Sequence, residues 1–511
     1  MRRLAPALLM TVVLGLLPFG ATQAQENNDP FVINDVIVEE SDTDRVKAQE
    51  VALDEAGNRY VFGRFDGNVE FGEGSNGQSL NGTDGDLFIA KYDTGNNLLW
   101  VQEFETSVRG ALPSANAAGI EFDDFFGNLY VAGDFRGGLD VGSKRLSSGA
   151  NADGFIAQLD PETGNVQWVN QIISGNQPVI VRDISATGTV VLTGRFGGIA
   201  EFPGQFETGE TLLSLTPGGE DMFAVLYSQV GQTSFAVQAG GNGAEGLGVY
   251  KDDNIFTVVG DFAGTIRFRD SNGREQAELT SQDGNDGFVV NYNDNGQLRF
   301  VTQIAGPDSD SAVHVVQKRF DIYVAGSFFN QTTIGVTRLT SRGQNDTYVA
   351  RISSLNGSVQ RVTQIGSNDI DFLRGLDGDN ADRRDGNIFV SGTFFGPQLI
   401  IGEGSTAIRL DKSDSSSRTA YLTAISVDGG VFTPSFGQIV QGRFNTNRIT
   451  VDEDSSNIYL AGGYQSAVTF GSRTTGRAIE LPEPTGQEGM AVAHYVSSSG
   501  SSSHDADASH R

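Results

Sequence analysis

One short pattern recurs along this chain of 511 residues and limits its fold more than any other feature. The pattern is an aromatic or aliphatic residue, then Val or Leu, any residue and Gly, as in Tyr60-Val61-Phe62-Gly63. Its closing glycines lie 61 to 70 residues apart, at Gly63, Gly133, Gly194, Gly260, Gly326, Gly392 and Gly462. Such a regular period is typical of a repeat architecture, in which each repeat is one supersecondary unit.

Each repeat predicts four β-strands. The first motif is followed by a second of the form Asp-x-Phe-Ile-Ala, such as Asp86 to Tyr92, and by a third, such as Trp100-Val101. All three are short, rich in β-branched and aromatic residues, and bounded by Gly, Asn and Asp. In the first repeat we expect strands at 51–54, 59–65, 86–92 and 98–104. Seven four-stranded antiparallel sheets arranged radially form a seven-bladed β-propeller, an all-β fold.

The two ends of the repeat array predict how the ring closes. The seventh repeat has only three strands before the chain becomes Ser-rich, so its outer strand is missing. The segment 31–40 stands alone before the first repeat and resembles an outer strand. We therefore expect this N-terminal strand to complete the last blade, within a propeller domain that spans 25–496.

The chain termini predict export. Residues 1–24 have a positive start, a short apolar run and small residues up to Ala24, which is the pattern of a signal peptide cleaved near Ala24. No second apolar span follows, so we expect no transmembrane segment after its removal. The Ser-rich stretch 497–511 predicts a disordered tail. The expected location is secreted, periplasmic or at the cell surface.

The charge and the lack of cysteine exclude several classes of function. The chain has 64 Asp and Glu against 35 Lys and Arg, a formal net charge of −29. A surface this acidic argues against binding nucleic acid through a general electrostatic field. The chain contains no Cys, which rules out disulfides, thiolate metal sites and cysteine nucleophiles.

The combined motifs resemble a known family. The pattern D-x-x-G-N-x-Y-V-x-G-x-F-x-G, followed by D-x-F-I-A-x-Y-D and Trp, is similar to the bacterial SBBP-type β-propeller repeat of exported and cell-surface proteins. The resemblance covers about residues 31–496 and is strongest in the first two repeats. It implies a propeller outside the cytoplasm. It brings no catalytic residue, because the family has no shared active-site motif.

Loop lengths distinguish the two faces of the expected ring. Turns between the first and second and between the third and fourth strands are short, whereas connections between the second and third strands are long, as at 66–85 and 263–285. The long connections contain apolar residues and predict extra hairpins. Binding functions favour elaborated loops on a rigid scaffold, which points to the long-loop face. The alternative is that these hairpins only cover sheet edges.

Residues that carry metal or acid–base chemistry are few. The stretch from Asp377 to Asp385 is the densest carboxylate cluster and has oxygens for Ca²⁺, but it misses EF-hand spacing, and a solvated turn is the simpler interpretation. The chain has four histidines, His314, His494, His504 and His510, of which the last two lie in the tail. We expect His494 to be a surface residue.

Two features that repeat in many blades predict architecture rather than chemistry. An Asp opens the third strand in five repeats, at Asp86, Asp153, Asp221, Asp286 and Asp346. We expect each to accept hydrogen bonds from backbone N–H groups. We expect the closing glycine of the first motif to allow neighbouring blades to approach each other.

These observations favour an exported, non-enzymatic β-propeller that serves as a binding or surface-interaction module for a protein or a glycan. Its expected contact region is the long-loop face with the central channel. The alternative is a hydrolase or lyase that acts on an extracellular polymer through loop carboxylates. A third possibility is a structural envelope protein without a discrete ligand. The sequence assigns no catalytic residue, no metal-binding residue and no cofactor, and it leaves the binding residues unknown.

Overall fold

The computed structural model describes residues 30–498 apart from 42–43, 108–114, 204–210, 216–218, 242, 380–385, 413–417 and 473–476. The signal peptide predicted at 1–24 and most of the predicted tail lie outside these residues. The described chain is all-β, with three short 3-10 turns at Gly74–Asn76, Gly404–Thr406 and Asp428–Gly430. Within it, no helix has the length and apolar character needed to span a bilayer.

The strands form antiparallel units of four, which we number from the N-terminus. Within units 1 to 6 the strands pair in chain order, whereas in unit 7 β1 lies beside β38. Unit 1 consists of β2 (Val46–Leu53), β3 (Arg59–Phe71), β4 (Gln78–Tyr92) and β5 (Leu98–Thr106). Unit 2 consists of β6 (Ala115–Asp123), β7 (Asn128–Phe135), β10 (Asp153–Leu159) and β11 (Val166–Ser174). Unit 3 consists of β12 (Val179–Thr187), β13 (Thr189–Phe196), β16 (Asp221–Tyr227) and β17 (Thr233–Gly240). Unit 4 consists of β18 (Ala244–Asp252), β19 (Ile255–Phe262), β22 (Asp286–Asn293) and β23 (Leu298–Ala305). Unit 5 consists of β24 (Asp310–Lys318), β25 (Asp321–Ile334), β26 (Thr337–Ser353) and β27 (Val359–Gly366). Unit 6 consists of β28 (Asp371–Gly378), β29 (Asn387–Phe394), β32 (Thr419–Ser426) and β33 (Thr433–Val440). Unit 7 consists of β34 (Phe444–Val451), β35 (Asn457–Tyr464), β38 (Gly489–Ser497) and β1 (Phe31–Glu39).

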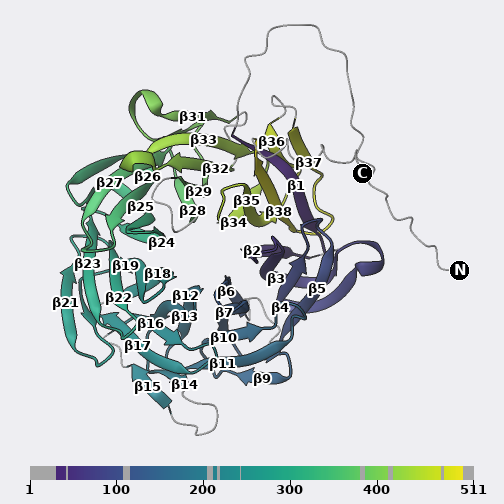
Figure 1. The fold of residues 1–511 in the computed structure, drawn as a ribbon, viewed down its shortest axis with the longest axis horizontal. Coiled ribbons are helices and arrows are strands. Elements are labelled where there is room, and N and C mark those ends of the chain that lie inside the picture. The colour runs from purple at the N-terminus through teal and green to yellow at the C-terminus, as the bar shows by residue number, and fades with distance from the viewer. Residues whose placement is uncertain are drawn as a thin grey trace, which may run out of the picture.

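The first strand of every unit lies nearest a common centre, and the other strands follow outward (Figure 1). Each of these inner strands contacts the inner strand of the next unit, and β34 of unit 7 contacts β2 of unit 1. The apolar core lies between adjacent sheets. One cluster, for example, joins Tyr130 and Trp168 of unit 2 to Phe196 and Phe223 of unit 3.

Unit 7 is built from both ends of the chain. β1 runs antiparallel to β38, with Val32 opposite Val496 and Glu39 opposite Met490. This is the pairing that the sequence predicts for the segment 31–40. Because β1 is the outermost strand of the unit, it covers the edge that β38 would otherwise leave unpaired.

The long connections between second and third strands form hairpins, as predicted. They are β8–β9 (Gly138–Val141, Lys144–Ser147), β14–β15 (Ala200–Pro203, Thr211–Leu215), β20–β21 (Thr265–Arg269, Glu275–Thr280), β30–β31 (Gln398–Ile401, Ile408–Asp411) and β36–β37 (Val468–Ser472, Arg477–Leu481). In units 1 and 5 they extend β3–β4 and β25–β26. The hairpins β8, β14, β20 and β30 pair with the outer strand of the preceding unit. The hairpins therefore cover sheet edges, which is the alternative interpretation of the long loops.

Every inner strand contains a β-bulge opposite the closing glycine of the repeat motif. In unit 4 the register shifts between Gly246 and Gly248, beside Gly260. A Cβ added at Gly260 would overlap the carbonyl oxygen of Glu245 on the paired strand, and Gly63 and Gly133 meet the carbonyls of their own inner strands in the same way. The prediction that this glycine lets neighbouring blades approach was wrong, because the close approach occurs within one sheet.

A different glycine brings neighbouring units together. Gly164, with φ +72°, lies in the turn between the third and fourth strands of unit 2, where a Cβ would stand 2.8 Å from the Trp100 ring of unit 1. The indole nitrogen of Trp100 donates to the carbonyl of Pro161 in the same turn, at 3.1 Å. Trp168 repeats the arrangement one unit later, against Gly231 and the carbonyl of Gln229. These contacts align each outer strand with the following unit.

Candidate functional site

A pocket of about 810 Å³ lies at the centre of the molecule. It is lined by the inner strands and by turns such as 54–57 and 452–454. We call the side with these turns the short-turn face. It carries the turns between first and second strands and between third and fourth strands. The sequence predicts the contact region on the long-loop face with the central channel. The pocket lies in that channel, but the turns that line it belong to the opposite face.

The β-bulges determine which side chains reach the centre. The residue that follows the bulge in each inner strand is, from unit 1 to unit 7, Glu50, Gly119, Asp183, Gly248, His314, Gly375 and Arg448. Large polar side chains thus alternate with glycine at one level of the channel. The four side chains, Glu50, Asp183, His314 and Arg448, all line the pocket. Glycine in the intervening units leaves room for them.

Arg448 joins two carboxylates at this level. Its guanidinium lies 2.7 Å from Oδ1 of Asp183 and 3.5 Å from Oε1 of Glu50, and all three side chains are at least 85% buried. The two carboxylates also accept backbone N–H groups, from Ile120 at 3.1 Å and Val249 at 2.8 Å. Burial raises the pKa of Glu50 and of Asp183, and Arg448 opposes that rise. Burial alone would lower the pKa of Arg448, but the two carboxylates outweigh it and the pKa is raised.

Two further carboxyl groups reach the pocket from the next level. Burial raises the pKa of Glu121 well above its usual value, and the charges of Glu50 and Asp183 add to the rise. Burial also raises the pKa of Asp377 to about 7, although its oxygens accept from the N–H groups of Gly378 and Val451, each at 2.8 Å. In the described part of the chain, Glu121 makes no ion pair. The pocket therefore holds more carboxyl groups than its single arginine compensates.

His314 lines the same pocket and has an unpartnered acceptor. The residue is only 7% exposed, and its Nδ1 has no hydrogen-bond partner. Burial and the charge of Arg448 lower its pKa well below the usual value, so the imidazole is neutral. The ring has a backbone hydrogen bond with Arg374. We infer that Nε2 donates to that carbonyl, which leaves the buried Nδ1 lone pair without a partner in a residue that lines the pocket.

The mouth of the pocket is acidic as well, with an apolar pair beside it. Partial burial and the like charges of Glu453 and Glu55 raise the pKa of Asp124 to about 6. Next to Asp124, the rings of Phe125 and Phe126 pack edge to face at 4.6 Å while remaining 72% and 47% exposed. This turn combines negative charge with exposed aromatic surface.

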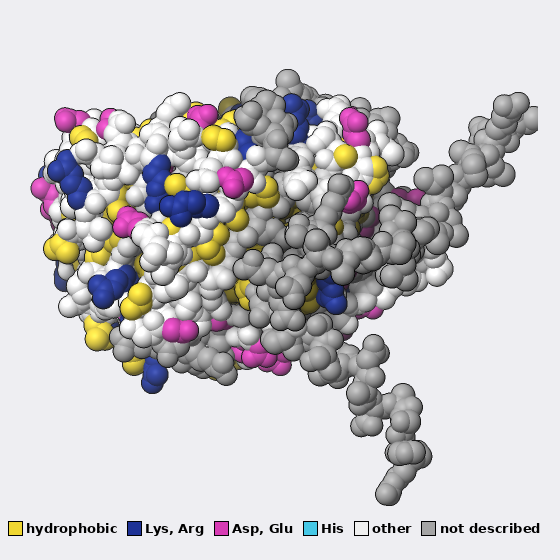
Figure 2. All heavy atoms as spheres, turned by 90° about the horizontal axis from the view of Figure 1, so that it is seen from above, with side chains coloured by type: hydrophobic (Ala, Val, Ile, Leu, Met, Phe, Trp, Pro, Cys, Tyr) yellow, Lys and Arg dark blue, Asp and Glu magenta, His cyan; other side chains and the backbone are white. Residues whose placement is uncertain are grey.

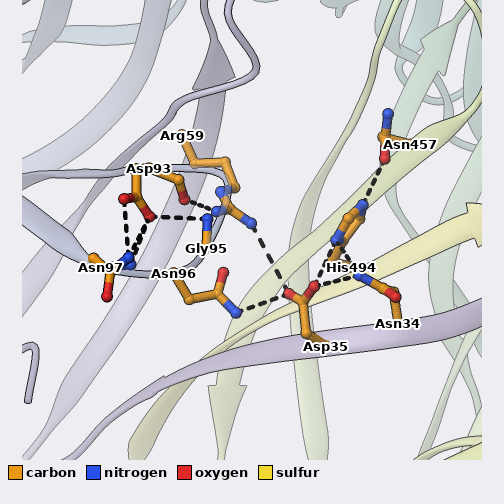
Figure 3. A network of polar contacts seen from close by, with 9 residues as sticks. All are labelled: Asn34, Asp35, Arg59, Asp93, Gly95, Asn96, Asn97, Asn457 and His494. Atoms are coloured by element: carbon orange, nitrogen blue, oxygen red, sulfur yellow. Dashed lines mark hydrogen bonds and ion pairs between the residues drawn. The ribbon is translucent and has the colours of Figure 1, made fainter. Parts of the chain in front are cut away.

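One side of the mouth is the junction between units 7 and 1, where Asp35 joins three elements (Figure 3). Its carboxylate lies 2.9 Å from Nδ1 of His494 on β38 and 3.0 Å from the amide nitrogen of Asn96 in unit 1. Arg59 lies 3.9 Å away. Burial would raise the pKa of Asp35, but the bonds from His494 and Asn96 outweigh it and the pKa is lowered.

His494 is not the surface residue that the sequence predicts. It is 7% exposed, its ring stacks on Tyr459 at 4.5 Å, and its Nε2 lies 2.7 Å from Oδ1 of Asn457. The equivalent residues of other units, Lys91 and Arg351 among them, are buried too. The prediction was wrong because a polar residue at this position suggests solvent exposure, whereas these side chains are buried against polar partners. Arg351 pairs with Asp321 of its own unit, and Lys91 pairs with Glu162 of the next unit at 3.0 Å.

The carboxylate cluster from Asp377 to Asp385, for which the sequence favours a solvated turn over a Ca²⁺ site, begins with two buried, partnered carboxylates. Asp377 lies in the pocket, and Asp379 pairs with Lys318 and accepts from Ser455 at 2.6 Å. The remaining part, 380–385, lies outside the described residues. Among the residues that are described, no group of three or more His, Asp or Glu side chains is placed to hold a metal ion.

The recurring aspartates are architectural, as predicted. Asp86 accepts from the backbone N–H of Thr106 at 2.7 Å, and Asp153 accepts from that of Ser174 at 3.0 Å. Both donors lie at the end of the fourth strand rather than at the start of the third. Asp221, Asp286 and Asp346 also accept backbone N–H groups, at 3.1 to 3.3 Å.

Among the described residues, the side of the molecule seen in Figure 2 shows no comparable concentration of charge. On the side seen in Figure 2, basic and acidic side chains are interspersed with single apolar ones. Exposed apolar residues scattered singly are normal for a protein surface. The central pocket is a site where charge, burial and an unpartnered polar atom coincide.

No protein-family model matches the chain, and no curated protein matches it. Among solved structures, this chain is similar to one chain of the mitotic checkpoint complex, at 10% sequence identity and a TM-score of 0.39. The match covers 89% of this chain and 95% of that chain. It is also similar to phage phi92 endosialidase, at 9% sequence identity and a TM-score of 0.37, over 92% of this chain and 69% of that chain. A third similar structure is quinohemoprotein alcohol dehydrogenase from Comamonas testosteroni, at 9% sequence identity and a TM-score of 0.34, over 93% of this chain and 78% of that chain. Similarity at this level carries no inference about what this chain binds.

Proposed function

We propose that the chain is an exported, seven-bladed β-propeller of the SBBP type that acts as a binding module. The four-stranded units are its blades, and β1 completes the last one. This reading is supported by the contacts that run from each inner strand to the next and from β34 back to β2. Export is supported by the signal-peptide pattern of residues 1–24.

The contact region of this module is the short-turn face. The observation that carries the proposal is the central pocket, in which buried carboxyl groups surround one arginine beside an unpartnered imidazole nitrogen. Concave sites with a few convergent polar groups are the usual places for ligands. The hairpins of the long-loop face are instead engaged in pairing with neighbouring sheets.

Charge reversal on the two faces tests this assignment. The chain from residue 25 is applied to glycan and peptide arrays, and its ligands are identified by retention. Changing Asp124 and Glu453 to Lys at the pocket mouth is expected to abolish binding. Changing Glu73 and Glu483 to Lys, which are exposed residues of second-to-third connections, is the matched control and should leave binding intact. The reverse result would return the contact region to the long-loop face.

A second candidate, a polymer hydrolase or lyase, is favoured by one observation in the same pocket. Glu121 has a raised pKa, while Arg448 opposes the rise in the pKa of Asp183. A general acid must keep its proton near neutral pH, and a carboxyl group with a raised pKa does so. Incubation with polysaccharides and measurement of new reducing ends tests this activity, and Glu121→Gln should remove it.

A further inference from the structure

The pocket on the short-turn face has one basic residue for many acidic ones. Its lining contains ten acidic residues, Glu50, Asp54, Glu55, Glu121, Asp124, Asp183, Asp377, Asp452, Glu453 and Asp454, against Arg448 as the single Lys or Arg. The whole chain has fewer than two acidic residues for each basic one, 64 against 35. The excess is therefore much greater in the pocket than in the chain as a whole.

The partners already present leave part of this charge uncompensated. Arg448 pairs with Glu50 and Asp183. Asp377 accepts two backbone N–H groups, and Glu121 accepts one from Ala186, but within the described chain no cation is paired with either. A buried carboxylate without a cation is costly, and a ligand that brings positive charge removes that cost.

His314 gives the second, independent indication. Its Nδ1 is a buried lone pair without a partner, and a lone pair requires an N–H or O–H donor. Carboxylates also only accept. A ligand that supplies several donors together with positive charge therefore suits this set of groups, because its charge favours the ionised form of Glu121 and Asp377, in which burial otherwise favours the protonated form. A metal ion is the competing solution, but the described carboxylates and histidines do not form a metal-binding group.

We propose that this pocket receives the guanidinium of an arginine side chain from a partner protein, between Glu121, Asp377 and His314. The inference rests on the proposed binding function and names its ligand chemistry. A guanidinium offers five N–H donors in a planar fork and keeps its charge when buried, so it suits several acceptors at once. Arg448 already shows a guanidinium seated between two carboxylates of this channel.

The mouth of the pocket indicates a peptide rather than a free small cation. Phe125 and Phe126 lie directly after Asp124, which lines the pocket, and both rings are exposed. Aromatic side chains beside a buried polar anchor point are typical of protein contact surfaces. A segment whose arginine enters the pocket can place its neighbouring apolar residues on these rings.

Two matched peptide libraries test the inference. One contains acetylated, amidated pentapeptides with arginine fixed at the centre, and the other has citrulline there, which keeps the shape but not the charge. Affinity is measured by titration against the chain from residue 25. We expect arginine peptides that bind at least about tenfold more tightly than their citrulline counterparts, with affinity falling as salt rises.

Variants of the chain locate the bound group. Glu121→Gln is expected to weaken the arginine peptides about tenfold. Glu103→Gln removes a carboxyl group of unit 1 that does not line the pocket, and should leave affinity unchanged. Thermal unfolding of each variant verifies that it is folded.

Three results would overturn the inference. Equal binding of arginine and citrulline peptides would exclude a charged anchor. Equal weakening by both variants would place the ligand elsewhere. Retention of a glycan or peptide ligand that requires Asp124 and Glu453, with no response to arginine, would refute the arginine pocket and leave the binding function standing. Absence of every ligand from the arrays would instead refute the binding function itself.

Discussion

Glu103 lies beside Asp86, at a position where four other units place a glutamine against the equivalent aspartate. In unit 4, for example, Nε2 of Gln303 donates to Oδ2 of Asp286 at 2.6 Å. Glu103 cannot donate such a bond when ionised, and its Oε1 is buried without a partner. Partial burial and the charge of Asp86 raise the pKa of Glu103 to about 7.

Replacing Glu103 by Gln should stabilise the protein at high pH. Between the ordinary glutamate pKa, about 4.3, and the folded value the folded state retains a proton that the unfolded chain has lost, so the stability of the unmodified protein falls as pH rises through this window. Gln avoids that loss. We expect a gain in unfolding free energy of about 1 kcal/mol at pH 8, after allowing for partial exposure, and little gain at pH 4.5. Urea denaturation at the two pH values measures it.

The reciprocal change provides the control. Gln303→Glu in unit 4 should lower the unfolding free energy at pH 8 and have a smaller effect at pH 4.5. A gain from Glu103→Gln that is equal at both pH values would contradict the explanation from the carboxyl pair.

A methyl group at Gly260 should be strongly destabilising. The Cβ would overlap the carbonyl oxygen of Glu245 on the paired strand, and backbone cannot move aside as a flexible side chain can. We expect Gly260→Ala to cost about 2 to 4 kcal/mol. Gly149→Ala is the control, because nothing lies within 4 Å of its Cβ position. Equal stabilities of the two variants in thermal unfolding would show that the bulge relaxes without cost.

Loss of Arg448 should be costly in a pH-dependent manner. Arg448→Ala leaves Glu50 and Asp183 buried without a cation, which we expect to cost about 3 to 5 kcal/mol at pH 8. Their folded pKa values then rise further, so protonation recovers part of the stability at pH 5. Arg145→Ala, which breaks an exposed pair with Asp140, should change stability by less than about 1 kcal/mol at either pH. A cost of Arg448→Ala that grows at low pH would refute the role of the two carboxylates.

Removal of residues 25–42 should abolish cooperative unfolding. Without β1, the edge of β38 is unpaired and the bonds from Asp35 to His494 and Asn96 are lost. Calorimetry should show a broad transition at lower temperature, and a synthetic peptide of residues 30–41 should restore the sharp one. Deletion of 499–511 is the control. A chain lacking 25–42 that melts as sharply, at the same temperature, would show that unit 7 does not need β1.

Millimolar Ca²⁺ should leave the melting temperature unchanged. Asp377 and Asp379 already have backbone or Lys318 partners, so binding of the ion would have to displace them. A rise of several degrees that EDTA reverses would show a Ca²⁺ site involving residues 380–385.

The strands and hairpins follow from the sequence because they depend on local patterns. The predicted strand at 59–65 is the start of β3, and the hairpin expected within 263–285 is β20–β21. β2 begins at Val46 rather than at residue 51. A β-bulge between Ala48 and Glu50 interrupts the alternation of inward and outward side chains, so the sequence pattern does not reveal the first part of the strand. A pattern of period two does not survive an extra residue.

The pocket residues escaped prediction for a related reason. Glu50, Asp183, His314 and Arg448 occupy one structural position, but they lie at different distances from their closing glycines because the intervening turns vary in length. Asp183 is 11 residues before Gly194, and Arg448 is 14 before Gly462. Aligning the repeats on the inner-strand bulge, instead of on the glycine, would have brought these polar residues into one column.

The pairing of β1 with β38 also has a consequence for the order in which the molecule is completed during synthesis. The hydrogen bond between Asp35 and His494 spans 459 positions of the chain, so the first of the described strands to be synthesised cannot pair until the last of them has been made. Each earlier unit meets its successor within about one repeat, whereas this junction has no partner until the ribosome has passed Ser497. The N-terminal segment should therefore become resistant to protease late and abruptly. Its resistance would report that β38 has been synthesised and has paired with β1.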